Sequence, residues 1–410
     1  MGTLAALISA YHEADEAGGG LRATLPLAGR TLVERQARLA ASAGADPIIL
    51  LVERIPATLL AAIDRLRGEG FKLVVARNAQ EAAEAVHPDD RLLLVADGLI
   101  AGQAHIARLL AVGASTLLTV PDLRVDDRFE RIDAHSRWAG LALLDAGMLK
   151  QTAAVLQDWD LQSTLLRRAV QGGARQIAVR GEPADDRLIV AERADDLDDM
   201  QARILAGAGA GSADWVSRYF AAPVEKGFTR LLMPTQIGAG TLCVIAAAAT
   251  GLAAGAFAVG WLWLGMLLLL LATPLDGTAE RLAALRVELS GGPSWWSHLL
   301  PVLAAAALLT LAWTLAAGSG WGCLVLAAAS IAFLAAARVE AAGHRPRGAL
   351  FLAERKGMTW LLMPFAVTGQ WVAGLLALTS YAAGSFFWIQ RQVHRPAPAP
   401  TRADAAPDQD

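Results

Sequence analysis

Cysteine is scarce in this sequence: its 410 residues include two, Cys243 and Cys323, and both lie in apolar runs. We interpret them as small core residues, because two such positions do not make a disulfide framework. An excess of basic charge is also missing, since the net charge is −3. No basic patch with interleaved aromatic residues occurs, so we expect no nucleic-acid partner. The N-terminus has no positively charged segment before its first apolar run, which favours a core strand over a signal peptide.

Apolar residues are abundant, at 55% of the chain, but they are unevenly spread. Residues 1–230 mix charged and apolar residues as globular domains do, whereas residues 231–391 carry long uncharged runs and most of the tryptophans. We therefore expect an α/β domain over 1–207, a linker and juxtamembrane segment over 208–230, and a membrane domain over 231–392. The tail 393–410 is rich in Pro, Ala and Asp and is expected to be disordered.

Short apolar runs alternate with helical patterns through the first domain. The segments LAALISA, PIILLVE, FKLVVA and RLLLVADG are typical of buried strands, and the segments between them have helical spacing. Continuous apolar strands that alternate with helices indicate a mostly parallel sheet covered on both faces. The fold class predicted for residues 1–207 is therefore a doubly wound α/β domain.

Three uncharged runs, at about 231–275, 296–337 and 357–390, predict an all-α membrane domain. A crossing helix needs about 20 residues, so each run is expected to hold two helices, with breaks near 254–260, 318–322 and 369–370. The cations fall in alternate connections, which is the positive-inside pattern: Lys226, Arg230, Arg281, Arg286, Arg338, Arg345, Arg347, Arg355, Lys356, Arg391 and Arg395. This predicts six helices with both termini cytoplasmic, in a phospholipid bilayer such as the bacterial inner membrane.

The segment Thr273–His298 is the heavily polar interruption of the membrane region. Asp276 and Gly277 follow directly after an apolar run, and a carboxylate at a bilayer edge is costly unless it is paired or bound to a ligand. The segment resembles the signature of the CDP-alcohol phosphatidyltransferases, D-x-x-D-G-x-x-A-R-x8-G-x-x-x-D-x-x-x-D. Asp276, Gly277 and Arg281 match its second Asp, its Gly and its Arg. The other motif positions depart from it and carry Thr273, Glu280, Ser290, Ser294 and His298.

This resemblance implies metal-assisted phosphoryl transfer from a CDP-alcohol. It places Asp276 and Glu280 at a Mg²⁺ or Mn²⁺ ion, Asp276 and His298 in catalysis, and Gly277 and Arg281 against the substrate. It also implies a homodimer through the membrane helices. Because the later aspartates are missing, we expect at most a phosphate-binding pocket around Asp276, Arg281 and His298. His298 has an alternative interpretation as an interfacial histidine beside two tryptophans.

The first domain resembles the sugar-phosphate nucleotidyltransferases. The segment GGGLRATLPLAGR contains Gly19, Gly20 and Arg22, which the resemblance places against a triphosphate such as that of CTP. It places Asp97 of VADG and Glu192 at a metal ion. Each of these residues also has a plain structural interpretation: the glycines and Asp97-Gly98 as turns, and Glu192 as a solvated residue before a helix.

The two resemblances together are similar to the bifunctional inositol-phosphate cytidylyltransferase/phosphotransferases. They imply a membrane-bound transferase of phospholipid or polyol-phosphate headgroup synthesis. The alternative is a membrane protein without activity that binds a nucleotide or phospholipid, or that partners an active synthase. A transporter is disfavoured, because the helices after Trp296 carry no charge within the membrane and show no repeat.

Overall fold

The computed structural model divides the chain into two compact units. One comprises Met1–Ala208 with the short segments Leu232–Gln236 and Leu282–Ser290, and the other comprises Gly209–Leu231, Ile237–Arg281 and Gly291–Asp410. The residues described are 2–15, 19–113, 115–122, 128–156, 160–179, 188–198, 200, 214–233, 235, 237–286, 295–341 and 348–394, and the side chains of residues 284 and 295–298 lie outside this description.

The first unit is built on a seven-stranded sheet with the order β10-β8-β9-β6-β1-β4-β5. Its strands are β1 (Leu4–Ser9), β4 (Ala45–Leu51), β5 (Leu73–Ala76), β6 (Arg91–Val95), β8 (Thr116–Pro121), β9 (Ser136–Asp145) and β10 (Arg175–Ala178). All neighbouring strands are parallel except that β9 is antiparallel to both β6 and β8. The α/β domain with a mostly parallel sheet, predicted from the alternating pattern, is confirmed.

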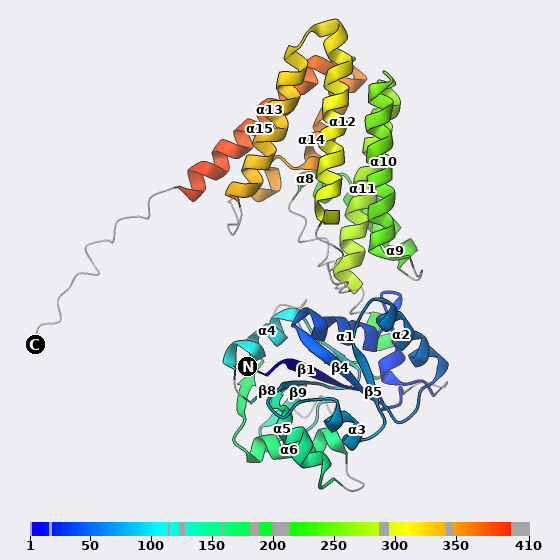
Figure 1. Ribbon diagram of the computed structural model, residues 1–410, viewed down its shortest axis with the longest axis vertical. Helices are drawn as coiled ribbons and strands as arrows, with labels where there is room; N and C mark the ends of the chain where they lie inside the picture. The colour runs from blue at the N-terminus through cyan, green and yellow to red at the C-terminus, as the bar shows by residue number, and fades with distance from the viewer. Residues whose placement is uncertain are drawn as a thin grey trace, which may run out of the picture. The chain divides into compact units, whose positions relative to one another are not determined.

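Helices cover both faces of this sheet. They are α1 (Leu32–Ser42), α2 (Ala57–Gly68), α3 (Ala79–Glu84), α4 (Gln103–Val112), α5 (Ala146–Ala153) and α6 (Leu161–Gln171). Figure 1 shows α3, α5 and α6 together on one face and α1 and α2 on the other. Two small two-stranded antiparallel sheets lie outside the main sheet: one pairs β2 (Pro26–Leu27) with β3 (Arg30–Thr31), and the other pairs β7 (Leu99–Ile100) with β11 (Ile189–Val190).

The second unit is helical. Its helices are α8 (Trp215–Tyr219), α9 (Ala222–Leu232), α10 (Ala239–Ala258), α11 (Leu262–Arg286), α12 (Trp295–Ser319), α13 (Gly322–Glu340), α14 (Arg355–Val367) and α15 (Trp371–Val393). The last residue of α9 and the last five residues of α11 are grouped with the first unit. The three breaks expected inside the apolar runs fall between α10 and α11, α12 and α13, and α14 and α15. Within the unit α10 packs along α12, and α13 packs along α15.

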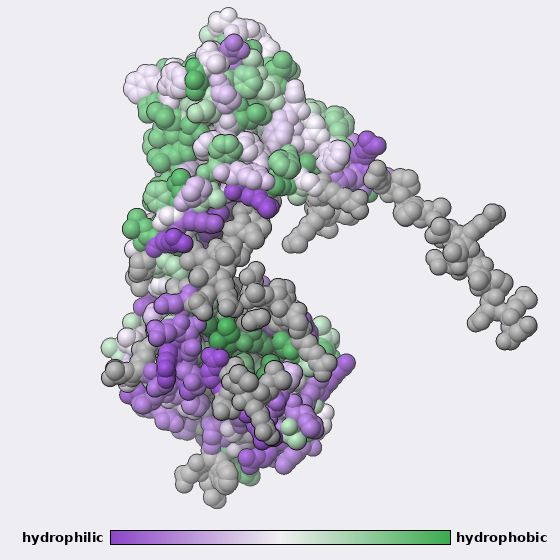
Figure 2. Space-filling view, turned by 180° about the vertical axis from the view of Figure 1, so that it is seen from behind, coloured by the Kyte–Doolittle hydropathy of each residue, from purple (hydrophilic) through white to green (hydrophobic). Residues whose placement is uncertain are grey.

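Five of these helices are long and apolar enough to cross a membrane. They are Ala239–Ala258, Leu262–Ala283, Leu299–Ser319, Gly322–Glu340 and Trp371–Val393. The sixth expected span corresponds to α14, which has 13 residues and is not among these five, because a crossing needs about 17 residues or more. Figure 2 shows hydrophobic colour over much of the helical unit. These helices are compatible with an integral membrane protein, and six spans are not confirmed.

Candidate functional site

Asp97 lies just beyond the carboxyl end of β6, and its carboxylate is almost fully buried. Its Oδ2 accepts hydrogen bonds from the backbone N–H groups of Tyr11 at 2.9 Å and His12 at 2.7 Å. Its Oδ1 is also buried and has no partner among the described residues. The carboxylate therefore fastens the segment after β1 to the end of β6 through one of its two oxygens.

Gly98 lets the chain turn where Arg22 and the β11 segment approach it. It has a φ of +70°, and a Cβ here would stand 2.5 Å from the carbonyl oxygen of Ala191 and 3.4 Å from the Cβ of Arg22. The Asp97 turn is thus in direct contact with the Arg22 segment, as the sequence predicts for two loops at one edge of a parallel sheet.

Arg22 and Glu192 form an ion pair at this edge, with 2.8 Å between Arg22 Nη2 and Glu192 Oε1. The carbonyl of Gly19 accepts a hydrogen bond from Arg54 at 2.9 Å, and the carbonyl of Gly20 accepts one from the N–H of Ala14. Gly18, the first glycine of the run, lies outside the described residues. The structure therefore brings Gly19, Gly20, Arg22, Asp97 and Glu192 together, with the cation already neutralised by a carboxylate.

Sequence reasoning missed the polar residues that extend this edge. The hydroxyl of Tyr11 donates to Asp160 at 2.5 Å, and Ser9 Oγ donates to the side-chain oxygen of Gln162 at 2.8 Å. Burial and the hydrogen bond to Asp160 raise the pKa of Tyr11, so its hydroxyl stays protonated and remains a donor. A polar Ser9 at the end of an otherwise apolar strand was the available signal.

In the helical unit Asp276 lies inside α11, and cations from the start of α14 surround it. Arg355 donates to its Oδ2, and Lys356 Nζ lies 3.5 Å from the same oxygen and 2.7 Å from Glu280 Oε2. Asp276 and Glu280 share a helix face because they are four residues apart. Both carboxylates are therefore committed to side-chain cations.

Arg281, on the same helix, pairs with Glu225 of α9. Arg281 Nε donates to Glu225 Oε2 at 2.8 Å, and both side chains are buried. Gly277 is required by this pair, since a Cβ there would stand 2.1 Å from Glu225 Oε1. Arg281 Nη1 is buried without a partner among the described residues. Glu225 was not predicted from the sequence, and its place on an amphipathic helix gave no sign that it points inward.

A Mg²⁺ or Mn²⁺ cluster does not fit these residues. Within the part of the chain that the structure describes, no group of three or more His, Cys, Asp or Glu side chains is placed to hold a metal ion. Asp276 and Glu280 already share the ammonium of Lys356, and Glu192 is held by Arg22. The side chain of His298, in α12, lies outside the described residues, so its expected place beside Asp276 stays a prediction.

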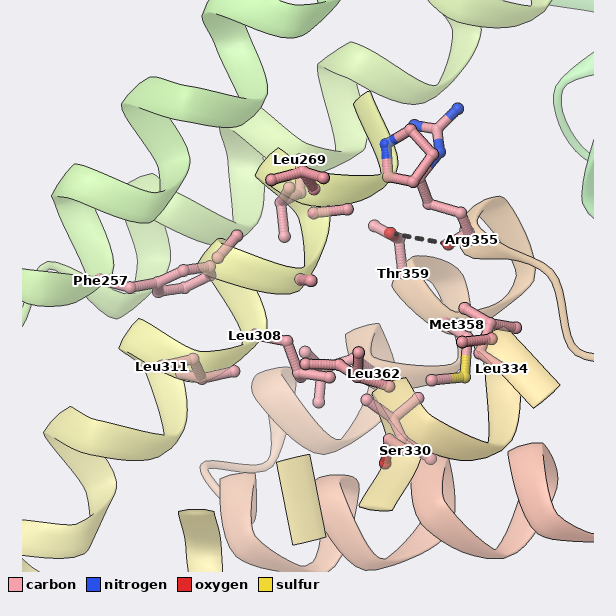
Figure 3. A pocket seen from close by; sticks show the side chains of 18 of the residues that line it. Phe257, Leu269, Leu308, Leu311, Ser330, Leu334, Arg355, Met358, Thr359 and Leu362 are labelled. Atoms are coloured by element: carbon pink, nitrogen blue, oxygen red, sulfur yellow. Dashed lines mark hydrogen bonds between the residues drawn. The ribbon is translucent and has the colours of Figure 1, made fainter. Parts of the chain in front are cut away.

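A cavity of about 250 Å³ lies within the helical unit beside this cluster (Figure 3). Its wall is mostly apolar and includes Phe257, Leu308, Leu311, Met358 and Leu362. Two arginines, Arg338 and Arg355, also line it. Arg355 thus belongs to both the cavity and the Asp276 cluster, and joins an apolar space to a charged one.

Comparison with known proteins assigns the chain to no family. No family model matches the sequence, and no curated protein matches it. The fold and the site therefore define the class: an α/β unit with a polar sheet edge, joined in one chain to a helical unit whose described residues include five candidate membrane spans.

Proposed function

We propose that this chain is an integral membrane protein whose helical unit binds an anionic phospholipid and does not carry out two-metal phosphoryl transfer. The observation that carries the proposal is that Arg355 both lines the apolar cavity and belongs to the charged cluster around Asp276. The apolar wall of the cavity suits a hydrocarbon chain, and the two arginines among its lining residues, Arg338 and Arg355, suit a phosphate. The volume of about 250 Å³ accommodates part of one acyl chain rather than two.

The ion pairs argue against transfer chemistry. A two-metal site needs carboxylates free to bind two cations about 4 Å apart. Asp276 is instead engaged by Arg355 and Lys356. The CDP-alcohol phosphatidyltransferase-like architecture remains part of the proposal, including a sixth span through α14, cytoplasmic termini and a bacterial inner-membrane location.

The test measures lipid retention by the purified full chain with native mass spectrometry, after incubation with phosphatidylglycerol or phosphatidylcholine vesicles. We expect phosphatidylglycerol to be retained in preference. Leu308→Trp fills the cavity and should abolish retention, whereas Val325→Trp, on a side chain that is 68% exposed, should not. Arg338→Gln should reduce the preference for the anionic lipid. Equal retention of both lipids, or retention unchanged by Leu308→Trp, would overturn the proposal.

Catalysis is tested on the same preparation with labelled CDP-alcohols, candidate acceptors and Mg²⁺ or Mn²⁺. We expect no CMP release above that of the Asp276→Asn variant. Robust release that disappears in Asp276→Asn would instead establish an active CDP-alcohol phosphatidyltransferase of phospholipid or polyol-phosphate headgroup synthesis.

A second candidate function concerns the α/β unit, where a nucleotidyltransferase-like domain would bind CTP. It is favoured by the contact between the Asp97 turn and Arg22, and by the free Oδ1 of Asp97. Isothermal titration with CTP and Mg²⁺ tests it, and Arg22→Gln should remove any binding. Arg67→Gln, at an exposed position of α2, is the control for loss of a guanidinium elsewhere in the unit.

A further inference from the structure

The pair formed by Arg281 and Glu225 is an unusual use of a guanidinium. Arg281 offers five N–H donors, yet Glu225 takes one of them at 2.8 Å, and Nη1 is buried with no partner among the described residues. Glu225 Oε1 has a second, longer contact, with the hydroxyl of Ser217 at 3.3 Å. A carboxylate and a guanidinium usually meet in a two-bond fork, so this contact leaves binding capacity unused.

The surroundings of the pair place Glu225 where a ligand anion would go. Its carboxylate lies against the backbone of Gly277, next to Asp276, and within the influence of both Arg281 and Lys356. Burial raises the pKa of Glu225 although the two cations oppose that shift. A buried ion pair of this kind is costly in desolvation, and a phosphate that offers more acceptors to Arg281 competes with it on favourable terms.

Glu225 also belongs to helix α9, which could move when the ion pair to Arg281 breaks. Helix α9 presents its apolar side chains Val224, Phe228 and Leu231 at 41–68% exposure, in the manner of a helix that lies on a membrane surface. Glu225 and Thr229 are its buried side chains. The Thr229 hydroxyl bonds the carbonyl of Glu225 within the helix, at 2.6 Å. The ion pair of Glu225 with Arg281 therefore joins the buried face of α9 to α11, and Arg286 Nη2 lies 3.4 Å from the carbonyl oxygen of Leu232 at the end of α9.

We propose that Arg281, which is not among the residues lining the cavity, is a second anion site occupied by Glu225 as a built-in competitor, and that an anionic lipid headgroup displaces Glu225 and releases α9. This rests on the proposed lipid-binding function and specifies its regulation. Exchange of one anion for another on a single guanidinium moves no covalent bond. The affinity of the unliganded protein is reduced by the free energy needed to break the internal pair.

Two variants weaken the competitor by different means. Glu225→Gln removes its charge. Gly277→Ala changes no charge but places a Cβ 2.1 Å from Glu225 Oε1, and alanine otherwise suits a helix better than glycine. Both should raise the affinity for phosphatidylglycerol by about tenfold, within the ~5–150-fold range of coupled sites. Glu340→Gln, which removes another paired acid of this unit, should leave the affinity unchanged.

The double variant Glu225→Gln/Arg281→Gln separates this competition from a general field effect. If Glu225 acts through Arg281, then Glu225→Gln gives no gain when Arg281 is already Gln. A gain that persists in that background would overturn the proposal.

Release of α9 is read by trypsin cleavage after Lys226, an exposed residue of that helix. Phosphatidylglycerol should increase this cleavage in the unaltered chain, and Glu225→Gln should increase it without lipid. If the unaltered chain retains no phosphatidylglycerol, the proposed function fails. If it does retain the lipid but Glu225→Gln and Gly277→Ala have the same affinity as the unaltered chain, this inference alone is wrong.

Discussion

Glu34→Ala should strongly destabilise the α/β unit, because Glu34 is a fully buried carboxylate at the start of α1. Its oxygens accept bonds from the N–H and hydroxyl of Thr31, each at 2.8 Å, and from Arg65 Nε and Nη2 at 3.0 and 2.9 Å. Arg38, also fully buried, lies 3.6 Å away. Glu34 is thus both the capping box of α1 and the anion of a buried charge network.

The expected cost is about 3–5 kcal/mol, the usual result of removing one partner from a buried ion pair. The lost helix cap alone would cost about 1 kcal/mol. This cost is not added to the ~3–5 kcal/mol, because the free-energy effects of contacts within one network are not additive. Arg38 keeps a two-bond contact with Glu69, at 3.0 and 2.8 Å, which prevents a larger loss. Glu84→Ala, at an exposed position of α3, should change the stability by no more than about 0.5 kcal/mol.

The assay is hydrogen exchange of the backbone amides of β1 and β6 in the full chain, read by peptide mass spectrometry, since these buried strands report opening of the α/β unit. Burial raises the pKa of Glu34, but the bonds from Arg65 and Thr31 outweigh it, and the net pKa is lowered from 4.5. The contribution is therefore present above pH 4.5 and is lost as the pH falls through the lower folded pKa. A loss below about 1 kcal/mol at neutral pH would refute this reasoning.

Three further predictions follow from the sites. Mg²⁺ or Mn²⁺ should not raise the melting temperature of the chain, because Asp276 already has cationic partners; a metal-dependent rise that is lost in Asp276→Asn would contradict this. Gly98→Ala should cost about 1–3 kcal/mol in thermal unfolding, since a side chain is strained at positive φ and its Cβ would stand 2.5 Å from a carbonyl oxygen. The Ser136 hydroxyl and the N–H of His135 lower the pKa of Asp133 to about 2, so stability from this group is present above pH 3.8 and lost as the pH falls toward 2. Ser136→Ala should raise that pKa in a carboxyl-carbon NMR titration.

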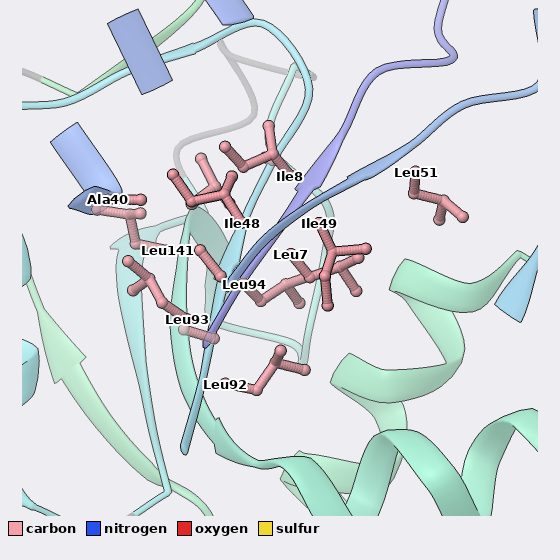
Figure 4. Packing of buried hydrophobic residues seen from close by; sticks show 14 of the residues in the cluster. Leu7, Ile8, Ala40, Ile48, Ile49, Leu51, Leu92, Leu93, Leu94 and Leu141 are labelled. Atoms are coloured by element: carbon pink, nitrogen blue, oxygen red, sulfur yellow. The ribbon is translucent and has the colours of Figure 1, made fainter. Parts of the chain in front are cut away.

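The fold of the first unit could be predicted because burial on both faces leaves a plain signature. On the adjacent central strands, Ile8 and Ile48 lie on one face of the sheet with Leu93, and Leu7 and Ile49 lie on the other face (Figure 4). Unbroken apolar runs of this length indicate buried parallel strands. The antiparallel direction of β9 could not be predicted, because an apolar run has the same composition in either direction.

In the membrane region the positions of the breaks between helices could be predicted from the sequence, but the number of membrane-crossing helices could not. Glycines inside the apolar runs mark where one helix stops and the next begins, and Gly260, Gly320 and Gly369 all have positive φ. The number of crossings depends on helix length, and α14 is too short for the criterion that its five neighbours meet. Hydrophobic pattern locates such a helix without showing whether it crosses the bilayer.

The candidate site was predicted best where its partners are close in sequence. Asp276 and Glu280 share a face because helical spacing places them there. Their partner Lys356 is remote in sequence. The segment GALFLAERKG shows that Lys356 follows another cation, but it does not show which carboxylates Lys356 contacts. Glu225 was missed because a buried acid on an amphipathic helix differs from an exposed one only in tertiary context.

The cations around Asp276 decide between the two interpretations of this motif. A carboxylate removed from water needs a compensating positive charge, and either a divalent ion or side-chain cations can supply it. A divalent ion and the side-chain cations repel each other at this site. Lys356 Nζ is 3.5 Å from Asp276 Oδ2, so a divalent ion on that oxygen would lie close to a second positive charge. Metal binding at Asp276 therefore requires Lys356 and Arg355 to leave, whereas a phosphate requires only that they exchange one anion for another. The same two residues that weaken the case for a metal-dependent transferase strengthen the case for an anionic ligand.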